Sequence, residues 1–122
     1  MKSRNLGNTG WSVSAVGLGG VPLSVPEMRP DEAAAIKVIH HAVDQGVTFI
    51  DTADSYGRGE TDMGHNERLF GRVLAQLPAD VRDQLVVATK PGFARPRDAW
   101  VPNGRPEYLP AQIGRASRTE SV

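Results

Sequence analysis

Two short runs of β-branched and apolar residues constrain this fold more than any other feature of the sequence. They span residues 47–50 and 85–89, and each is followed directly by a charged side chain, Asp51 and Lys90 respectively. Neither run alternates apolar with polar residues, which is typical of parallel strands that helices cover. We therefore expect a parallel sheet whose strands alternate with helices through right-handed crossovers.

The segments between and after these runs have helical patterns. Apolar residues recur at i, i+3 and i+7 spacing between Pro30 and Gly46. Proline suits the first turn of a helix, and glycine suits the position just past its end. Further helices are expected over residues 66–77 and from Pro106 to residue 113.

The N-terminal segment has a turn signal, Gly-Asn-Thr-Gly at residues 7–10. It predicts a hairpin over residues 2–13, and a strand over residues 15–19 follows. The element order is thus a hairpin, then β-α-β-α-β and part of a helix. This order predicts an α/β fold.

The composition narrows the functional classes. The 122 residues are 39% hydrophobic, and 14 Lys and Arg balance 14 Asp and Glu. That balance gives no reason to expect nucleic acid or an anionic membrane as partner. There is no cysteine, no signal-peptide pattern, and no apolar run near the roughly 20 residues that span a bilayer. We expect a cytoplasmic protein of unknown oligomeric state.

Three ionisable residues lie at or just beyond the ends of expected strands, where α/β proteins bind ligands: Asp51, Tyr56 and Lys90. Singly, each has an ordinary interpretation as a cap, a packing residue or a solvated charge. A tyrosine is a poor acid near neutrality because its ordinary pKa is about 10, but a nearby ammonium lowers that pKa. With a carboxylate holding the lysine, such a trio can protonate a carbonyl oxygen while hydride arrives at carbon.

Weaker patterns suggest other sites. Residues 17–20 begin like a dinucleotide-binding motif, but Pro22 stands where its third glycine belongs. One polar loop brings together four residues of metal-binding type: Glu60, Asp62, His65 and Glu67. Their spacing fits neither an EF-hand nor a zinc helix motif, so we expect a solvated loop and no metal site. Trp100 either lines a substrate loop or simply packs.

Several motifs, in the same order along the chain, resemble the aldo-keto reductase family. Residues 49–57 (FIDTADSYG) resemble the signature around that family's catalytic aspartate and tyrosine. Residues 66–71 (NERLFG) resemble the helix start that follows, and residues 86–90 (VVATK) the strand that delivers the catalytic lysine. Residues 5–10 and 13–19 resemble the hairpin and the first barrel strand.

The resemblance implies a (β/α)8 TIM barrel and an oxidoreductase that uses NADP(H) on aldehydes, ketones or the corresponding alcohols. Tyr56 would be the general acid, Lys90 would lower its pKa, and Asp51 would pair with Lys90. Gly20, Val21 and Asp51 would contact the cofactor, whose phosphates the family binds mostly through its C-terminal half. The expected partner is thus a small carbonyl or alcohol substrate.

The chain also departs from the family. A complete barrel has eight strands, and the sequence predicts about three. The family's fourth catalytic residue, a histidine after the fourth strand, has no match among His40, His41 and His65. Residues 114–122 lose apolar periodicity, so we expect a divergent, loosely packed tail on a partial domain spanning residues 1–122.

Two functional hypotheses follow from this departure. In one, the chain represents an NADP-dependent oxidoreductase whose full-length form is active. In the other, it is a catalytically incomplete fragment with no activity of its own. A truncation, a frame change or a gene-model error would each explain the ending, and the sequence leaves these open.

Overall fold

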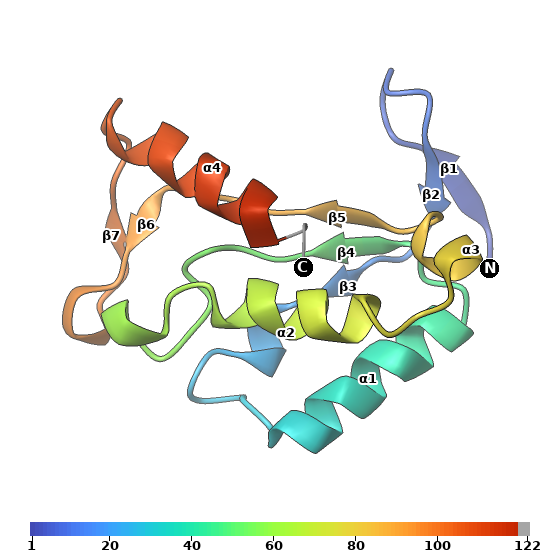
Figure 1. Ribbon diagram of the computed structural model, residues 1–122, viewed down its shortest axis with the longest axis horizontal. Coiled ribbons are helices and arrows are strands. Elements are labelled where there is room, and N and C mark those ends of the chain that lie inside the picture. The colour runs from blue at the N-terminus through green and yellow to red at the C-terminus, as the bar shows by residue number, and fades with distance from the viewer. Residues whose placement is uncertain (120–122) are drawn as a thin grey trace.

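A three-stranded parallel sheet with helices packed on it forms the body of the molecule (Figure 1). The computed structural model describes residues 1–119, with side chains up to residue 115. The strand order is β3 (Leu18–Gly19), β4 (Phe49–Asp51) and β5 (Val86–Ala88). The expected alternation of parallel strands with helices is confirmed. The first strand is shorter than expected, because only two of residues 15–19 pair with β4.

The helices α1 (Glu32–Asp44) and α2 (His65–Leu74) pack against each other and against the sheet. Asp31 caps α1 by accepting a hydrogen bond from the Ala34 amide at 2.7 Å, which satisfies one of the helix's free N–H groups. Gly46, just past the end of α1, has a φ of +86°, which a glycine adopts without strain. α2 ends earlier than expected, and a short helix, α3 (Ala79–Arg82), follows it.

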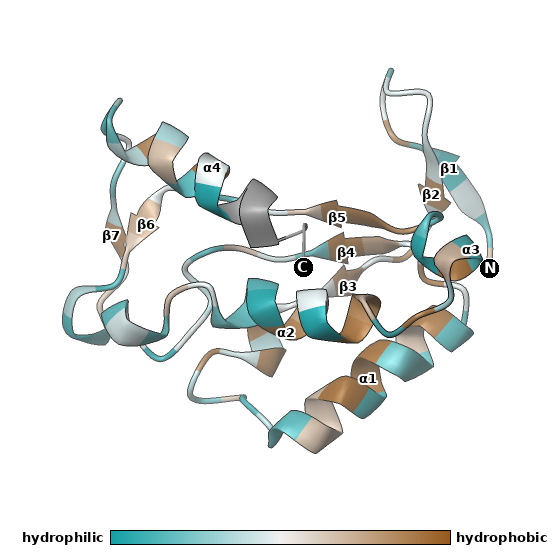
Figure 2. Cartoon of the chain, viewed as in Figure 1, coloured by the Kyte–Doolittle hydropathy of each residue, from teal (hydrophilic) through white to brown (hydrophobic). Residues whose placement is uncertain are grey.

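The hydrophobic core lies between the sheet and these two helices. Figure 2 shows that β5 is hydrophobic along its length and that β4 is hydrophobic up to its last residue, Asp51. The core consists of seven buried side chains from these elements and the loop after β3: Leu23, Ala35, Ile39, Ile50, Leu69, Phe70 and Val73. Ile50 on the central strand is completely buried, whereas its neighbour Asp51, on the opposite face, is only partly buried.

Two antiparallel pairs flank the sheet. The expected N-terminal hairpin is confirmed, as β1 (Ser3–Asn5) pairs with β2 (Ser12–Ser14). A second pair, β6 (Phe93–Ala94) with β7 (Val101–Pro102), stands where the sequence predicts only a loop. Two-residue strands separated by a turn rich in proline and charge leave no detectable periodicity.

The last helix, α4, spans Tyr108–Thr119 and packs on α2 (Figure 1). The prediction that helical structure ends at residue 113 is therefore wrong. Once a helix is nucleated, each further residue adds a backbone hydrogen bond whether or not its side chain is apolar, so lost periodicity does not end it. The part of the predicted tail that covers residues 120–122 lies outside the described residues. No helix formed by the described residues is long and apolar enough to cross a membrane.

Candidate active site

Asp51 and Lys90 meet at the C-terminal end of the parallel sheet. Asp51 is the last residue of β4, and Lys90 lies two residues after the end of β5, its neighbour in the sheet. The Lys90 Nζ donates hydrogen bonds to Asp51 Oδ1 and to the Thr52 carbonyl oxygen, both at 2.7 Å. The two residues thus converge as the sequence predicts, because parallel strands end at the same edge.

Tyr56 completes the cluster from the loop between β4 and α2. The Lys90 Nζ lies 5.1 Å from the centroid of the Tyr56 ring. Burial acts to lower the pKa of Lys90, but hydrogen bonds with the Asp51 and Tyr56 side chains outweigh it and raise that pKa above its ordinary value. Lys90 therefore stays an ammonium throughout the neutral range, beside the Tyr56 ring.

An aromatic wall stands beside Tyr56. Trp100 contacts the Tyr56 ring edge-on at a centroid distance of 6.4 Å, and Phe93 contacts Trp100 at 5.8 Å. Trp100 is 44% exposed, so it packs against the cluster and still presents surface to solvent. The packing interpretation of Trp100 is confirmed, and its role in a substrate loop stays a prediction.

The expected cofactor residues differ in what they offer. Gly20 is close to Asp51, since its amide donates to the Asp51 carbonyl oxygen at 2.8 Å, but its own carbonyl accepts from Asn66. A Cβ at Gly20 would lie 2.0 Å from Asn66 Oδ1, so packing within the chain already explains the glycine. Val21 follows it and is partly exposed, and the Asp51 side chain is 43% exposed.

A fully buried asparagine, Asn66, ties the segments around the site together. Its Nδ2 donates to the Gly20 carbonyl and to Ser24 Oγ, and its Oδ1 accepts from Thr52 Oγ1 at 2.6 Å. One side chain thus links the loop after β3, the end of β4 and the start of α2. The sequence does not predict this role, because an asparagine at a helix start is ordinarily interpreted as a cap.

The polar loop after Tyr56 forms an internal network. Arg29 donates to Asp62 at 2.7 Å and to His65 Nε2 at 2.6 Å, and His65 Nδ1 lies 2.8 Å from Ser24 Oγ. Burial and the Arg29 charge lower the pKa of His65, which favours its neutral form. Within the described residues, no group of three or more His, Cys, Asp and Glu side chains is placed to hold a metal.

Arg95 is a second residue that the sequence analysis did not single out. It is 2% exposed and donates to the carbonyl oxygens of Ser55 and Gly57, on either side of Tyr56. Sequence patterns report side-chain periodicity and carry no signal for an arginine whose partners are backbone carbonyls.

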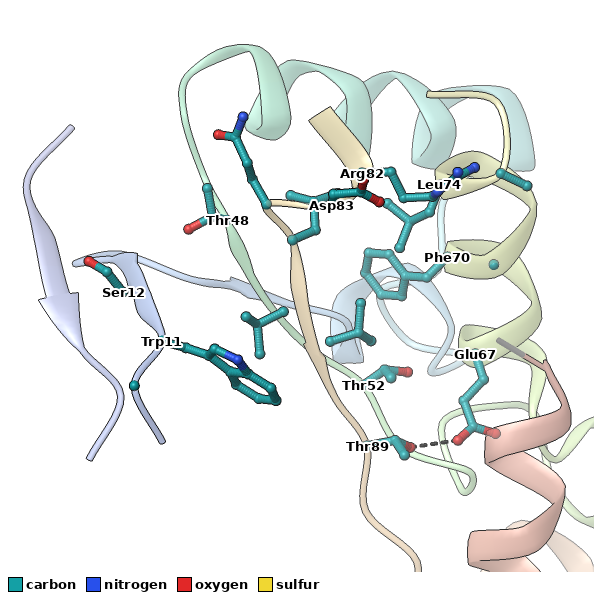
Figure 3. Close-up of a pocket in the computed structure, with 17 residues that line it drawn as sticks. Trp11, Ser12, Thr48, Thr52, Glu67, Phe70, Leu74, Arg82, Asp83 and Thr89 are labelled. Atoms are coloured by element: carbon teal, nitrogen blue, oxygen red, sulfur yellow. Dashed lines mark hydrogen bonds between the residues drawn. The ribbon is translucent and has the colours of Figure 1, made fainter. Parts of the chain in front are cut away.

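A cavity of about 1080 Å³ lies elsewhere, beside β5 (Figure 3). Trp11 and Ser12 of the N-terminal segment, Phe70 of α2, and Val87 of β5 are among the residues that line it. Asp51, Tyr56 and Lys90 do not line it, and the Thr89–Glu67 hydrogen bond at 2.5 Å closes one end. β3 and β5 are the two edge strands of the three, so the cavity lies beside one open edge of the sheet.

Known proteins resemble this chain over most of its length. The family model described as aldo/keto reductase family matches residues 15–119. The chain is 42% identical over 94 residues to a 6-dehydroglucose reductase from Novosphingobium aromaticivorans, covering 76% of this chain and 30% of that protein. It is 40% identical over 106 residues to a probable aldo-keto reductase of Glycine max, covering 85% of this chain and 28% of that protein.

The fold agrees with solved structures of the same kind. A Bacillus halodurans aldo-keto reductase superposes on the whole chain with a TM-score of 0.78 at 26% identity, and the match covers 37% of that structure. The α/β fold is the N-terminal part of a TIM barrel with a leading hairpin, as the sequence predicts. This chain spans under a third of the length of the two curated relatives. The chain belongs to the aldo/keto reductase family.

Proposed function

We propose that this chain carries the proton-transfer part of an NADP(H)-dependent oxidoreductase that interconverts small aldehydes or ketones with their alcohols. The observation that carries the proposal is the Lys90 ammonium, bonded to Asp51 and lying beside the Tyr56 ring. Two relatives add support. One is named for the reduction of a sugar that carries a carbonyl group, and the Bacillus halodurans structure is a holo form.

Each member of the cluster has a distinct role. Tyr56 gives its hydroxyl proton to the carbonyl oxygen of the substrate as that oxygen gains negative charge. Lys90 stabilises the negative charge left on the Tyr56 oxygen, because an ammonium favours the phenolate form. Asp51 keeps Lys90 charged and in place. In the oxidative direction the Tyr56 phenolate takes the proton of the alcohol.

NADP(H) supplies or accepts the hydride when bound. Asp51 and Val21 are the residues of this chain that would hold it, since Asp51 ends β4, Val21 follows β3 closely, and both keep exposed surface. Gly20 would contribute by shape alone, because its amide and carbonyl are already bonded to Asp51 and Asn66. Trp100 and Phe93 would shield the substrate carbonyl from water on the other side.

A second candidate is that the 122-residue polypeptide by itself is catalytically incomplete. The positions of the histidines favour this candidate. His65 is bonded to Ser24 and Arg29, and His40 and His41 lie in α1, so no histidine of the chain is placed beside Tyr56 to orient a carbonyl. The site then needs residues supplied from outside residues 1–122.

A chimera tests the proposed role of Tyr56 separately from the question of whether residues 1–122 suffice for activity. Residues 1–119 are joined to the C-terminal remainder of the 6-dehydroglucose reductase, and the product is called the completed chimera below. NADPH consumption is measured with a panel of small aldehydes. Tyr56→Phe is expected to lower the rate by about 100-fold or more, as removal of a general acid does.

The matched control is Tyr108→Phe, which removes the only other tyrosine of the chain. Tyr108 donates to the Phe93 carbonyl and contacts no member of the cluster, so its removal should change the rate by less than about 3-fold, the effect of one ordinary hydrogen bond. Equal losses in the two variants would count against Tyr56 as the acid.

A further inference from the structure

The backbone hydrogen bonds of Tyr56 itself are long, although its loop also has short ones, such as that from the Gly64 amide to the Asp54 carbonyl at 2.6 Å. The Tyr56 amide donates to the Ala53 carbonyl at 3.4 Å, and the Tyr56 carbonyl accepts from the Asn66 amide at 3.3 Å, both at the long end of the range. Much shorter bonds flank the residue. Nη1 of Arg95 donates to the Ser55 carbonyl at 2.7 Å and to the Gly57 carbonyl at 3.0 Å. A single nitrogen therefore joins the two sides of Tyr56.

Arg95 is buried as a cation without a carboxylate partner. In the described part of the chain, the ion pairs join other residues, and none of them includes Arg95. Its Nη1 and Nη2 atoms donate to carbonyl oxygens, its Nε has no hydrogen-bond partner among the described residues, and the Trp100 ring centroid lies 3.8 Å from its Cζ. A planar, weakly hydrated guanidinium suits this setting and a lysine ammonium does not.

The other terminal nitrogen of the same guanidinium binds the turn between β6 and β7. Nη2 donates to the Asp98 carbonyl at 3.2 Å. Arg97 and Asp98 have φ values of +47° and +64°, a conformation that costs side-chain-bearing residues energy and persists where the surroundings enforce it. The turn is also pressed against the loop after Tyr56, since a Cβ at Gly59 would lie 2.0 Å from Asp98 Oδ1.

We propose that Arg95 is a positioning residue, which holds the Tyr56 hydroxyl at the Lys90 ammonium by fixing the carbonyls on both sides of Tyr56 and the indole beside it. The catalytic consequence rests on the proposed function, but the positioning itself does not. Arg95 touches neither Lys90 nor the Tyr56 side chain in any described hydrogen bond, so it acts only through the loop and Trp100.

The test observes Tyr56 directly in the 122-residue chain. The two tyrosines, labelled as 3-fluorotyrosine, give two ¹⁹F NMR signals, which Tyr108→Phe assigns. In Arg95→Ala, the Tyr56 signal should move to the position it has in the urea-denatured chain. Low millimolar guanidinium should restore most of the displacement by filling the vacated site, whereas methylammonium, a cation without the planar fork, should not.

Arg97→Lys is the matched control, because Arg97 lies in the same turn, is exposed and makes no hydrogen bond in the described part of the chain. If Arg95→Ala no longer unfolds cooperatively, Arg95→Lys replaces it. The Tyr56 signal of Arg95→Lys is also expected to move to the position it has in the urea-denatured chain. Any of three results overturns the proposal. The Tyr56 signal stays in place in these variants, or it already coincides with the denatured position in the unaltered chain, or guanidinium and methylammonium restore it equally.

Kinetics of the completed chimera then separate this proposal from the proposed function. Arg95→Lys should lower kcat by about 10-fold with little change in the KM for NADPH, as expected when the acid is misplaced but cofactor binding is kept. If Tyr56→Phe loses activity but the Tyr56 signal does not move in Arg95→Lys, the positioning role of Arg95 is rejected and the catalytic role of Tyr56 stands. A moved signal without any effect of Tyr56→Phe would reject the catalytic role alone.

Discussion

The C-terminal end of the sheet and its β5 edge differ in how completely side chains bond and pack there. At its C-terminal end, short hydrogen bonds link Asp51, Lys90, Arg95 and the loop of Tyr56. Along the β5 edge, a cavity of about 1080 Å³ lies beside half-buried residues. The difference teaches that the arrangement of Asp51, Tyr56 and Lys90 is a local property of two adjacent βα units. Closing the sheet is a separate, long-range requirement.

The comparison is sharpest for two residues that are partners in the sheet. Ile50 of β4 and Val87 of β5 are in register, but Ile50 is completely buried whereas Val87 lines the cavity. Ile50→Ala should lower the free energy of unfolding by about 3 kcal/mol, and Val87→Ala by about 1 kcal/mol, because the second site already borders empty space. Urea denaturation of both variants measures this, and equal losses would mean that the β5 side is as well packed as the centre.

A buried carboxyl next to the site gives a smaller, pH-dependent effect. Burial, with the nearby Glu67 charge, raises the pKa of Asp54 to about 6, and neither carboxylate oxygen has a hydrogen-bond partner among the described residues. The pKa of Asp54 is higher in the folded chain than in the unfolded chain. Protonation of Asp54 therefore stabilises the fold at low pH, and this stabilisation is lost as the pH rises through 6.

Asp54→Asn removes that titration. The variant should match the unaltered chain near pH 4 and exceed its stability by about 2 kcal/mol at pH 8, on the linkage between pKa and stability. Urea midpoints at both pH values provide the measurement. A constant difference between the two proteins would show that Asp54 ionises freely in the fold, through its approach to Arg115 at 4.0 Å.

The smallest effect concerns the bond at the centre of the site. Asp51 and Lys90 side chains are 43% and 48% exposed, so their ion pair contributes little to folding. Asp51→Asn should change the free energy of unfolding by less than about 1 kcal/mol, which is typical of surface ion pairs. Glu32→Gln, which breaks the somewhat more exposed pair with Arg72, is the control. A much larger loss for Asp51→Asn would mean that the pair serves the fold before the chemistry.

The sequence predicts the convergence of Asp51 and Lys90 because strand-end positions follow from buried runs and parallel topology. It does not predict Arg95, whose side-chain hydrogen bonds go to backbone carbonyls, or Asn66, whose side-chain partners lie in other elements. The β6–β7 pair is missed because its turn depends on left-handed Arg97 and Asp98, residues without a glycine signal. The extension of α4 is missed because backbone bonding continued where side-chain periodicity ended.

The central claim is that this chain contains a preorganised proton donor but needs further barrel residues for hydride transfer. The most direct test compares NADPH consumption by the purified 122-residue chain and by the completed chimera, with the same aldehydes. Holding nicotinamide and carbonyl in reactive geometry is worth about 7–11 kcal/mol in favourable cases, and we propose that the chain's own residues do not supply it. We therefore expect turnover by the chimera alone. Turnover by the isolated chain that disappears in Tyr56→Phe would contradict the account.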